Sequence, residues 1–408
     1  MVINLIVLGL FKYFNFFIES FIDLISLIGY DLPRSTTKII LPVGISFYTF
    51  LSLSYIIDIQ RKTLKANKNV AEVLLSLSFF PIILAGPIQR PASLLPQIGK
   101  KREFNYAQAV DGLKQLLWGL FTKVVIADNL AVFVDELFLN YSNYSGSTLF
   151  IAAIFYTIQI YADFSGYSDM AIGIAKLFGF SLMRNFAFPY FSRNIMEFWK
   201  RWHISLVSWF RDYVFLPFSF AVSWRLKGEK VLFIRNELFI YILASGVVWF
   251  LTGLWHGANY TFIIWGIIHG LFLVLYKWQT RPRKRLLKKF KISNKNTVLV
   301  VIEPLLTLFI VIMAWIFFRA SSIEQAVGIF SEIFSSSLFL APIKFPKYLL
   351  ILLLGFIVIE WIGRSNNYAI EKMPFSRHRI VRWSFYYIIL AVMFVYSGEG
   401  QPFIYFQF

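Results

Sequence analysis

The sequence contains no cysteine, and only 15% of its 408 residues are charged. Without cysteine the chain has no disulfide framework, no thiolate nucleophile and no cysteine-based metal site. An ordinary globular protein carries about 25% charged and roughly 45–50% apolar residues. Here 58% of the residues are hydrophobic and the mean hydropathy is +0.64. This composition excludes a water-soluble domain and predicts a protein embedded in a membrane.

The chain also lacks the signatures of nucleotide and nucleic-acid binding. It has no Gly-rich phosphate loop, no zinc-ligand spacing and no repeat of aromatic and basic residues. Its net charge of +18 would indicate nucleic acid in a soluble protein. Here, however, the basic residues lie in short loops between apolar runs, as the positive-inside rule describes. We therefore expect the lipid bilayer as a partner, and no nucleic acid.

Runs of about 20 apolar residues recur along the chain, and a helix of that length crosses the hydrocarbon core of a bilayer. We expect an all-α polytopic membrane protein with about nine to eleven transmembrane helices, plus re-entrant and interfacial helices. We treat residues 1–408 as a single domain. The first run has no basic n-region and no cleavage site, so it reads as a membrane segment and not as a signal peptide. The apolar runs are 1–29, 38–58, 70–89, 107–139, 147–178, 236–255, 259–276, 297–318, 324–341, 346–363 and 383–397.

Three of these regions are less regular than the others. The run 107–139 carries charged residues, which favours an amphipathic helix followed by a partial span. The run 147–178 becomes polar at Asp163 and Asp169. Because an intramembrane carboxylate is costly unless it faces protein or water, this helix is expected to line a cavity. Residues 184–213 are aromatic, basic and interrupted by Pro189, which predicts interfacial and re-entrant pieces.

Only four histidines are available for acid–base chemistry: His203, His256, His269 and His378. His378 lies in a basic loop, which indicates a surface position. His203 follows an aromatic and basic helix, a pattern typical of the headgroup level. For His269, packing against a neighbouring helix is the favoured interpretation. His256 and His269 would be about 20 Å apart on one continuous helix, so we expect no metal site.

The position of His256 is the strongest functional signal in the residues themselves. A basic patch ends at Arg235, and another runs from Lys277 to Lys295 with nine Lys or Arg and no acidic residue. Both patches are expected in the cytoplasm, so the segment between them should form a helical hairpin with His256 at its midpoint. A straight helix would place this imidazole roughly 30 Å from the cytoplasmic surface. An ionisable residue at that depth indicates either a general base for a hydroxyl or a histidine hydrogen-bonded within a helix bundle.

Nine short motifs follow one another in order along the chain. They are Phe79 to Pro81, Ala85 to Ile88, Tyr161 to Asp169, Asn185 to Pro189, Arg193-Asn194, Phe198 to Leu206, Trp209 to Tyr213, Thr252 to Asn259 and Phe403 to Phe408. With these motifs, essentially the whole chain resembles the membrane-bound O-acyltransferase (MBOAT) superfamily. The resemblance is to the bacterial branch that O-acetylates alginate and peptidoglycan. The D-alanyl transferases of teichoic acid export are a more distant likeness.

The resemblance implies an MBOAT-like fold around a central funnel or tunnel, which joins a cytoplasmic acyl donor to an acceptor on the outer side. It implies that His256 is the catalytic histidine and that His203 is a second active-site residue. Similar proteins have further apolar helices upstream of a segment like Leu8 to Phe14, so this chain is expected to be either truncated or a short member. The motif residues that we expect to bind substrate are Trp255, Asn194, Trp199 and Asp169.

The function that the resemblance implies is transfer of an acyl group, acetyl, from acetyl-CoA or another acyl thioester for O-acetylation of a cell-surface polysaccharide. It implies no metal, a periplasmic or extracellular partner acetyltransferase similar to serine hydrolases, and a place in the bacterial cytoplasmic (inner) membrane. One alternative is D-alanyl transfer to teichoic acid. Another is a transporter or exporter without acyl chemistry, although the chain shows no inverted repeat.

Overall fold

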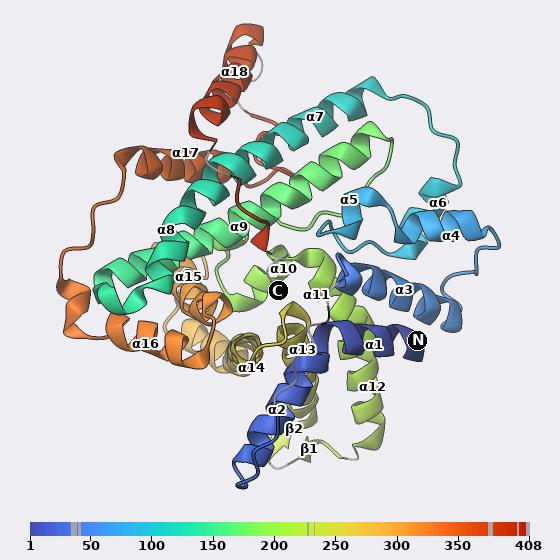
Figure 1. The fold of residues 1–408 in the computed structure, drawn as a ribbon, viewed down its shortest axis with the longest axis vertical. Coiled ribbons are helices and arrows are strands. Elements are labelled where there is room, and N and C mark those ends of the chain that lie inside the picture. Colours follow the sequence, from blue (N-terminus) through green and yellow to red (C-terminus); the bar gives the residue numbers. More distant parts are fainter. Residues whose placement is uncertain are drawn as a thin grey trace.

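The computed structural model describes residues 1–33, 39, 42–226, 228–231, 233–373, 378–397 and 400–404. These residues are helical almost throughout, and Figure 1 shows their arrangement. The α-helices are α1 (Val2–Leu8), α2 (Phe14–Ser26), α3 (Ile45–Gln60), α4 (Val70–Leu77), α5 (Phe80–Ile83), α6 (Pro91–Ile98), α7 (Tyr106–Phe121), α8 (Asp128–Leu139), α9 (Gly146–Leu177), α10 (Ile195–Arg201), α11 (Ile204–Phe210), α12 (Leu216–Arg225), α13 (Asn236–His256), α14 (Tyr260–Lys289), α15 (Thr297–Arg319), α16 (Ile323–Ile333), α17 (Lys347–Gly363) and α18 (Arg379–Tyr396).

Shorter elements join or interrupt these helices. The π-helical segments are η1 (Gly9–Tyr13), η2 (Thr122–Ala127) and η5 (Arg211–Phe215). The 3₁₀ turns are η3 (Tyr141–Asn143), η4 (Pro189–Phe191) and η6 (Ser336–Phe339). The strands β1 (Lys230–Val231) and β2 (Ile234–Arg235) pair antiparallel, with Lys230 opposite Arg235. This small hairpin leads directly into α13.

Seven helical runs in the described ranges are long and apolar enough to cross a membrane. They are Val2–Ser26, Tyr106–Leu139, Gly146–Leu177, Asn236–His256, Tyr260–Lys289, Thr297–Arg319 and Arg379–Tyr396. The predicted all-α polytopic fold is confirmed. Two further apolar helices, α3 and α17, are shorter, with 16 and 17 residues. The apolar run 70–89 is divided between α4 and α5, because the chain leaves the helix at Ser78 and restarts around Pro81.

The run from Tyr106 to Leu139 is one continuous helical run through η2, long and apolar enough to cross a membrane. The expected amphipathic helix with a partial span stays a prediction. One of the charges in this run is neutralised inside the protein. The Lys123 ammonium lies 2.7 Å from Asp128 and 2.6 Å from Asp163 of α9. A charge that is paired within the protein does not have to reach the aqueous phase.

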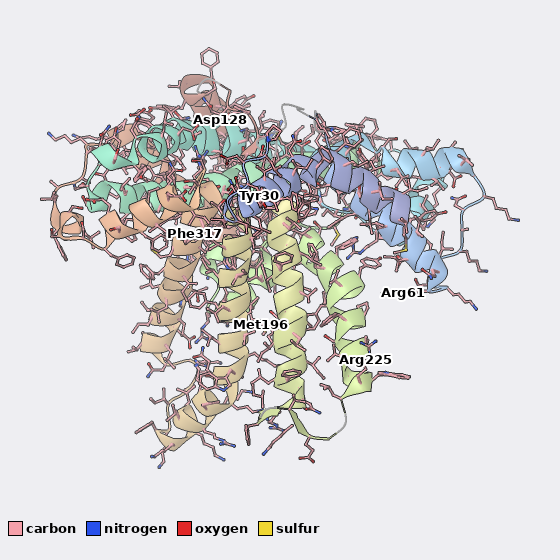
Figure 2. All side chains as sticks on the ribbon, turned by 60° about the horizontal axis from the view of Figure 1, so that its bottom comes forward. Tyr30, Arg61, Asp128, Met196, Arg225 and Phe317 are labelled. Carbon is pink, nitrogen blue, oxygen red and sulfur yellow. The ribbon has the colours of Figure 1, made fainter. Side chains whose placement is uncertain are left out.

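Helices α12 to α15 extend side by side away from a broad layer that contains α7, α8 and α9 (Figure 2). Arg225 lies near their far end, and Asp128 lies in the layer. An ion pair of 3.2 Å between Arg281 and Glu237 joins the last part of α14 to the first turn of α13. The basic ends of α13 and α14 therefore lie together, and the predicted helical hairpin is present.

Glycine lets the two helices of this hairpin approach closely. A Cβ atom at Gly253 would lie 2.4 Å from the carbonyl oxygen of Phe262, and one at Gly266 would lie 2.3 Å from that of Trp249. The chain turns immediately after His256, and Asn259 caps α14 by accepting a hydrogen bond from the Thr261 N–H at 2.9 Å. His256, the last residue of α13, is thus held against the first turns of α14.

Candidate active site

His256 lies at the end of α13, buried inside a box of aromatic rings. The ring centroids of Trp255 and Trp265 are each 4.9 Å from that of the imidazole, and Phe318 of α15 is 5.0 Å away. All three contacts are edge-on. Aromatic edges and faces fix the orientation of a ring without hydrogen bonds. The imidazole is therefore held in one orientation in a largely apolar space.

His203 is equally buried, and it has an uncommon backbone conformation. It separates α10 from α11 with φ 43° and ψ 51°, in the left-handed region. A non-glycine residue pays roughly 1–3 kcal/mol there, and such residues concentrate at functional sites. The strained turn directs the His203 ring into the core, where its centroid is 4.6 Å from that of Phe164 on α9. His203 does not lie on an exposed helix face, because the structure buries it completely.

Asn185 determines which nitrogen of His203 carries the proton. Its Oδ1 atom lies 3.0 Å from His203 Nδ1 and accepts hydrogen bonds from the Ser205 hydroxyl at 2.8 Å and the Ser205 N–H at 3.3 Å. The backbone donor identifies this atom as the oxygen, so Nδ1 of His203 must be the donor. Burial lowers the pKa of His203 to about 3. His203 is therefore neutral near pH 7, with its proton on Nδ1 and none on Nε2.

Trp255 connects the two histidines. Its ring centroid is 5.9 Å from that of His203 and 4.9 Å from that of His256. Phe47 and Phe50 of α3 contact the same indole, each with centroids 5.7 Å apart from it. The indole thus forms a shared wall between the two imidazoles, supported from behind by α3.

The third buried histidine, His269, joins the same cluster from α14. Its Nδ1 accepts a hydrogen bond of 3.3 Å from the Trp199 indole, so the proton of the neutral ring lies on Nε2. The chain folds back between α13 and α14, and Trp265 lies 4.9 Å from His256 and 5.0 Å from His269 between ring centroids. Nε2 of His269 and Nε1 of Trp265 are buried and have no hydrogen-bond partner among the described residues. Since buried donors are normally bonded, these two could serve a bound group.

The structure separates the four residues that the sequence predicted to bind substrate into two groups. Trp255 and Trp199 lie in the aromatic cluster. Asn194 instead caps α10, because its side chain accepts a hydrogen bond from the Glu197 N–H at 2.9 Å. Asp169 accepts a hydrogen bond of 2.6 Å from Gln115 of α7. Asn194 and Asp169 are thus engaged in bonds that organise helices.

Three residues of the site were not singled out from the sequence, namely Lys12, Asn185 and Trp265, and His269 was interpreted as a packing residue. Asn185 was part of a motif, but its contact with His203 depends on the strained turn. Lys12 could have been identified from the sequence, because it is a basic residue within an apolar run. An ionisable residue in such a run indicates a functional site by default. The Lys12 ammonium donates to the backbone carbonyl of Trp255 at 2.5 Å.

A cavity of about 320 Å³ reaches this cluster from the side of α10, α11 and η5. Trp199 and Trp249 form part of its wall, and their ring centroids are 4.3 Å apart. Lys200 and Arg211 also line the cavity and give it a positive charge. The cavity follows α13 from Tyr241 toward the site. It therefore extends from the half of α13 nearer the basic end to the rings around His269.

Comparison with known proteins adds an independent line of evidence. The profile of the membrane-bound O-acyltransferase family matches residues 60–323. The chain is 38% identical to the probable alginate O-acetylase AlgI of Pseudomonas aeruginosa, over 82% of this chain and 59% of that protein. It is 34% identical to the peptidoglycan O-acetyltransferase of Helicobacter pylori, over 81% of this chain and 62% of that protein.

A teichoic acid D-alanyltransferase of Bacillus subtilis is 30% identical, over 64% of each chain. The chain thus spans about three fifths of the length of the alginate O-acetylase. The matched range, 60–323, runs from the last residue of α3 to the first residue of α16. It contains His203, His256 and His269. On this match, which covers more than half of the sequence, the chain belongs to the membrane-bound O-acyltransferase family.

Proposed function

We propose that the chain is a multi-pass membrane O-acyltransferase that passes an acetyl group from a thioester to a hydroxyl, for O-acetylation of a cell-surface polysaccharide. The observation that carries the proposal is the pair of buried imidazoles, His203 and His256, in contact with one indole ring. The names of the relatives, alginate O-acetylase and peptidoglycan O-acetyltransferase, support the reaction and the class of acceptor.

In this proposal His256 is the general base. It takes the proton of the acceptor hydroxyl while the hydroxyl oxygen attacks the thioester carbonyl. A C–O bond forms, the C–S bond breaks, and the departing thiolate recovers the proton from His256. Negative charge develops on the carbonyl oxygen, and donors at about 2.7–3.1 Å would stabilise it. The buried N–H groups of Trp265 and His269 suit that role, and His203 orients or polarises the reacting group.

The donor that we propose is acetyl-CoA, which enters along the cavity between α13 and the segment α10, α11 and η5. Its phosphates are anionic, and Lys200 and Arg211 supply positive charge at this cavity. The cavity volume of about 320 Å³ admits a thin chain such as a pantetheine arm. We assign the basic ends of α13 and α14 to the cytoplasm, where acyl thioesters are made.

The acceptor that we propose is a serine hydroxyl of a periplasmic or extracellular partner acetyltransferase, which completes transfer to the polysaccharide. The protein itself would lie in the bacterial cytoplasmic membrane. A neighbouring gene for a serine-hydrolase-like acetyltransferase would support acetyl relay. A neighbouring D-alanine carrier system would support D-alanyl transfer, which the similarity to a teichoic acid D-alanyltransferase favours as the second candidate.

Replacement of His256 tests the proposed reaction. In host cells that lack the native gene, the His256→Ala variant should abolish polysaccharide O-acetylation at an unchanged level of folded protein. The exposed His378 offers the matched control, and His378→Ala should keep full O-acetylation. Mass spectrometry of the released acyl group distinguishes acetyl from D-alanyl. Retained acylation in His256→Ala, or solute flux without thioester consumption in proteoliposomes, would contradict the proposal.

A further inference from the structure

The N-terminal helical run meets the end of α13 that carries His256. Figure 1 shows α1 and α2 crossing near α13, and hydrogen bonds establish the contact. The Lys12 ammonium donates to the carbonyl of Trp255 at 2.5 Å and to that of His256 at 3.5 Å. The Tyr13 hydroxyl donates to the carbonyl of Leu254 at 2.9 Å. Two adjacent side chains thus bind three consecutive carbonyls at the end of the helix.

The helix itself supplies no hydrogen-bond donor to these carbonyls. The last four carbonyls of an α-helix have no intrahelical N–H partner, and the C-terminal end carries a partial negative charge. Gly257 follows with φ −172° and ψ 157°, so the chain becomes extended directly after His256. The cap of α13 is therefore supplied from outside the hairpin, by a cation and a hydroxyl from the N-terminal run.

A lysine suits this position because its side-chain nitrogen can donate to several acceptors at once. An ammonium has three donors, and three acceptors surround Lys12: the two carbonyls and the Ser46 hydroxyl at 3.4 Å. Its nitrogen also lies 5.7 Å from the centroid of the Trp255 ring, within cation–π range. The contact to Ser46 connects the cap to α3, which supports the same indole through Phe47 and Phe50.

Lys12 lies in η1, a π-helical segment between α1 and α2. Such segments appear frequently at functional sites, because the wider turn changes the direction of nearby side chains. Leu8, Tyr13 and Ile45 form a small apolar cluster here, with Leu254 and Ala258 packed against it. The N-terminal run therefore packs on both sides of the turn that follows His256. Residues 1–59 lie outside the range matched by the family profile.

We propose that Lys12 is a positioning residue that acts through the backbone of Trp255 and His256. By binding both carbonyls it fixes the last turn of α13, and with it the imidazole of His256 against Trp255. The inference rests on the proposed function, in which His256 is the general base. Loss of the cap would let the end of α13 fray, and a displacement of about 1 Å can reduce the rate of an enzyme by about 10²-fold.

The experiment compares the unaltered chain with three variants in membrane vesicles that also hold the proposed partner acetyltransferase as acceptor, with acetyl-CoA as the donor and thiol release as the signal. Lys12→Met keeps the aliphatic stem and removes all three donors. It should lower kcat by about 10²-fold and leave the KM for acetyl-CoA within about twofold, because donor binding does not involve the cap. Lys12→Arg keeps the charge and should recover part of kcat. Lys65→Met, at an exposed lysine, should match the unaltered protein.

The His256→Ala variant separates the two proposals. If it retains thiol release, the proposed function fails, whatever Lys12 does. If it is inactive while Lys12→Met keeps full kcat, the positioning role is wrong. A rise in KM at constant kcat would also overturn the positioning role, because it would place Lys12 in donor binding.

A further variant covers the case in which Lys12→Met does not accumulate in the membrane. Ser46→Ala removes one acceptor of the ammonium and leaves the lysine in place. The positioning role predicts a reduction of kcat by several-fold without a change in KM or in thermal midpoint. An unchanged kcat in Ser46→Ala would contradict the proposal.

Discussion

At the scale of single residues, the chemistry of the site depends on side chains that fix the histidines. Asn185 holds His203 in one tautomer through a single oxygen that accepts from Nδ1, from the Ser205 hydroxyl and from the Ser205 N–H. Three donors on one acceptor are costly to abandon in a buried position. The tautomer of His203 and the orientation of its ring therefore depend on Asn185 as well as on the histidine.

Replacement of Asn185 by leucine, which has a similar shape but no acceptor, tests this dependence. Each buried donor left unpaired should cost about 1–3 kcal/mol, so the thermal midpoint in detergent should fall. Asn185→Asp keeps two acceptor oxygens and should lose less. If Asn185→Leu has the midpoint and thiol-release rate of the unaltered chain, the interaction with His203 has no role.

The residue scale is also where prediction from sequence was weakest. The position of His256 in the hairpin was predictable, because basic patches flank that hairpin symmetrically. The partners of His203 could not be predicted from the sequence. The contact with Asn185 requires a left-handed backbone conformation at His203, and no local sequence pattern indicates that conformation. Asn194, a motif position expected at the substrate, caps a helix in the structure, and its contact with substrate stays a prediction.

At the scale of helices, close packing between α13 and α14 determines where His256 lies. The two helices meet at Gly253 and Gly266. At each glycine, a backbone oxygen of the partner helix occupies the space that a side chain would need. Small residues allow such approaches in membranes, where burial of apolar surface contributes little to helix association. The predicted hairpin was correct for this pair, because hydropathy and charge define its ends. The short helices α10 and α11 were not individually predictable, since their bounds depend on burial in the core.

Two glycines of α13 form a matched pair for an element-scale test. A Cβ at Gly253 meets the Phe262 carbonyl at 2.4 Å, whereas one at Gly246 has nothing within 4 Å. Gly253→Ala should therefore destabilise the protein by about 1–3 kcal/mol through overpacking. Gly246→Ala should be neutral or stabilise by up to about 1 kcal/mol, because alanine favours the helix.

Thermal midpoints of the two purified variants provide the measurement. The order matters more than the size of either shift. Equal midpoints for Gly253→Ala and Gly246→Ala would show that α13 and α14 do not approach as closely as described.

At the scale of the whole molecule, the basic residues gather at one end of the bundle that α12 to α15 form (Figure 2). The loop after α14 and the hairpin before α13 share that end, as the Arg281–Glu237 ion pair shows. The turn after His256 and the segment after α15 lie at the other end, where Asn259 donates to the carbonyl of Ser321 at 3.0 Å. The direction of the proposed acyl transfer across the membrane depends on which end of the bundle faces the cytoplasm.

The absence of cysteine makes this orientation directly measurable. A single cysteine at Lys291, beyond α14, should react with a membrane-impermeant maleimide only in inside-out vesicles. A single cysteine at the exposed Ser321 should react only from the opposite side of the membrane. The unaltered chain supplies a background without thiols. Labelling of both positions from one side would refute the assignment of the basic end to the cytoplasm.

The cap of α13 also has a consequence in time. Lys12 and Trp255 are 243 positions apart in the chain. A ribosome adds about 5–20 residues per second, so Lys12 is synthesised on the order of 10–50 s before the carbonyls that it binds. Until then its ammonium stays in apolar surroundings without these acceptors, which is a costly state. An incomplete chain that stops before α13 ends holds Lys12 but neither the carbonyls that it binds nor His256, so nascent copies without the proposed base should not consume donor.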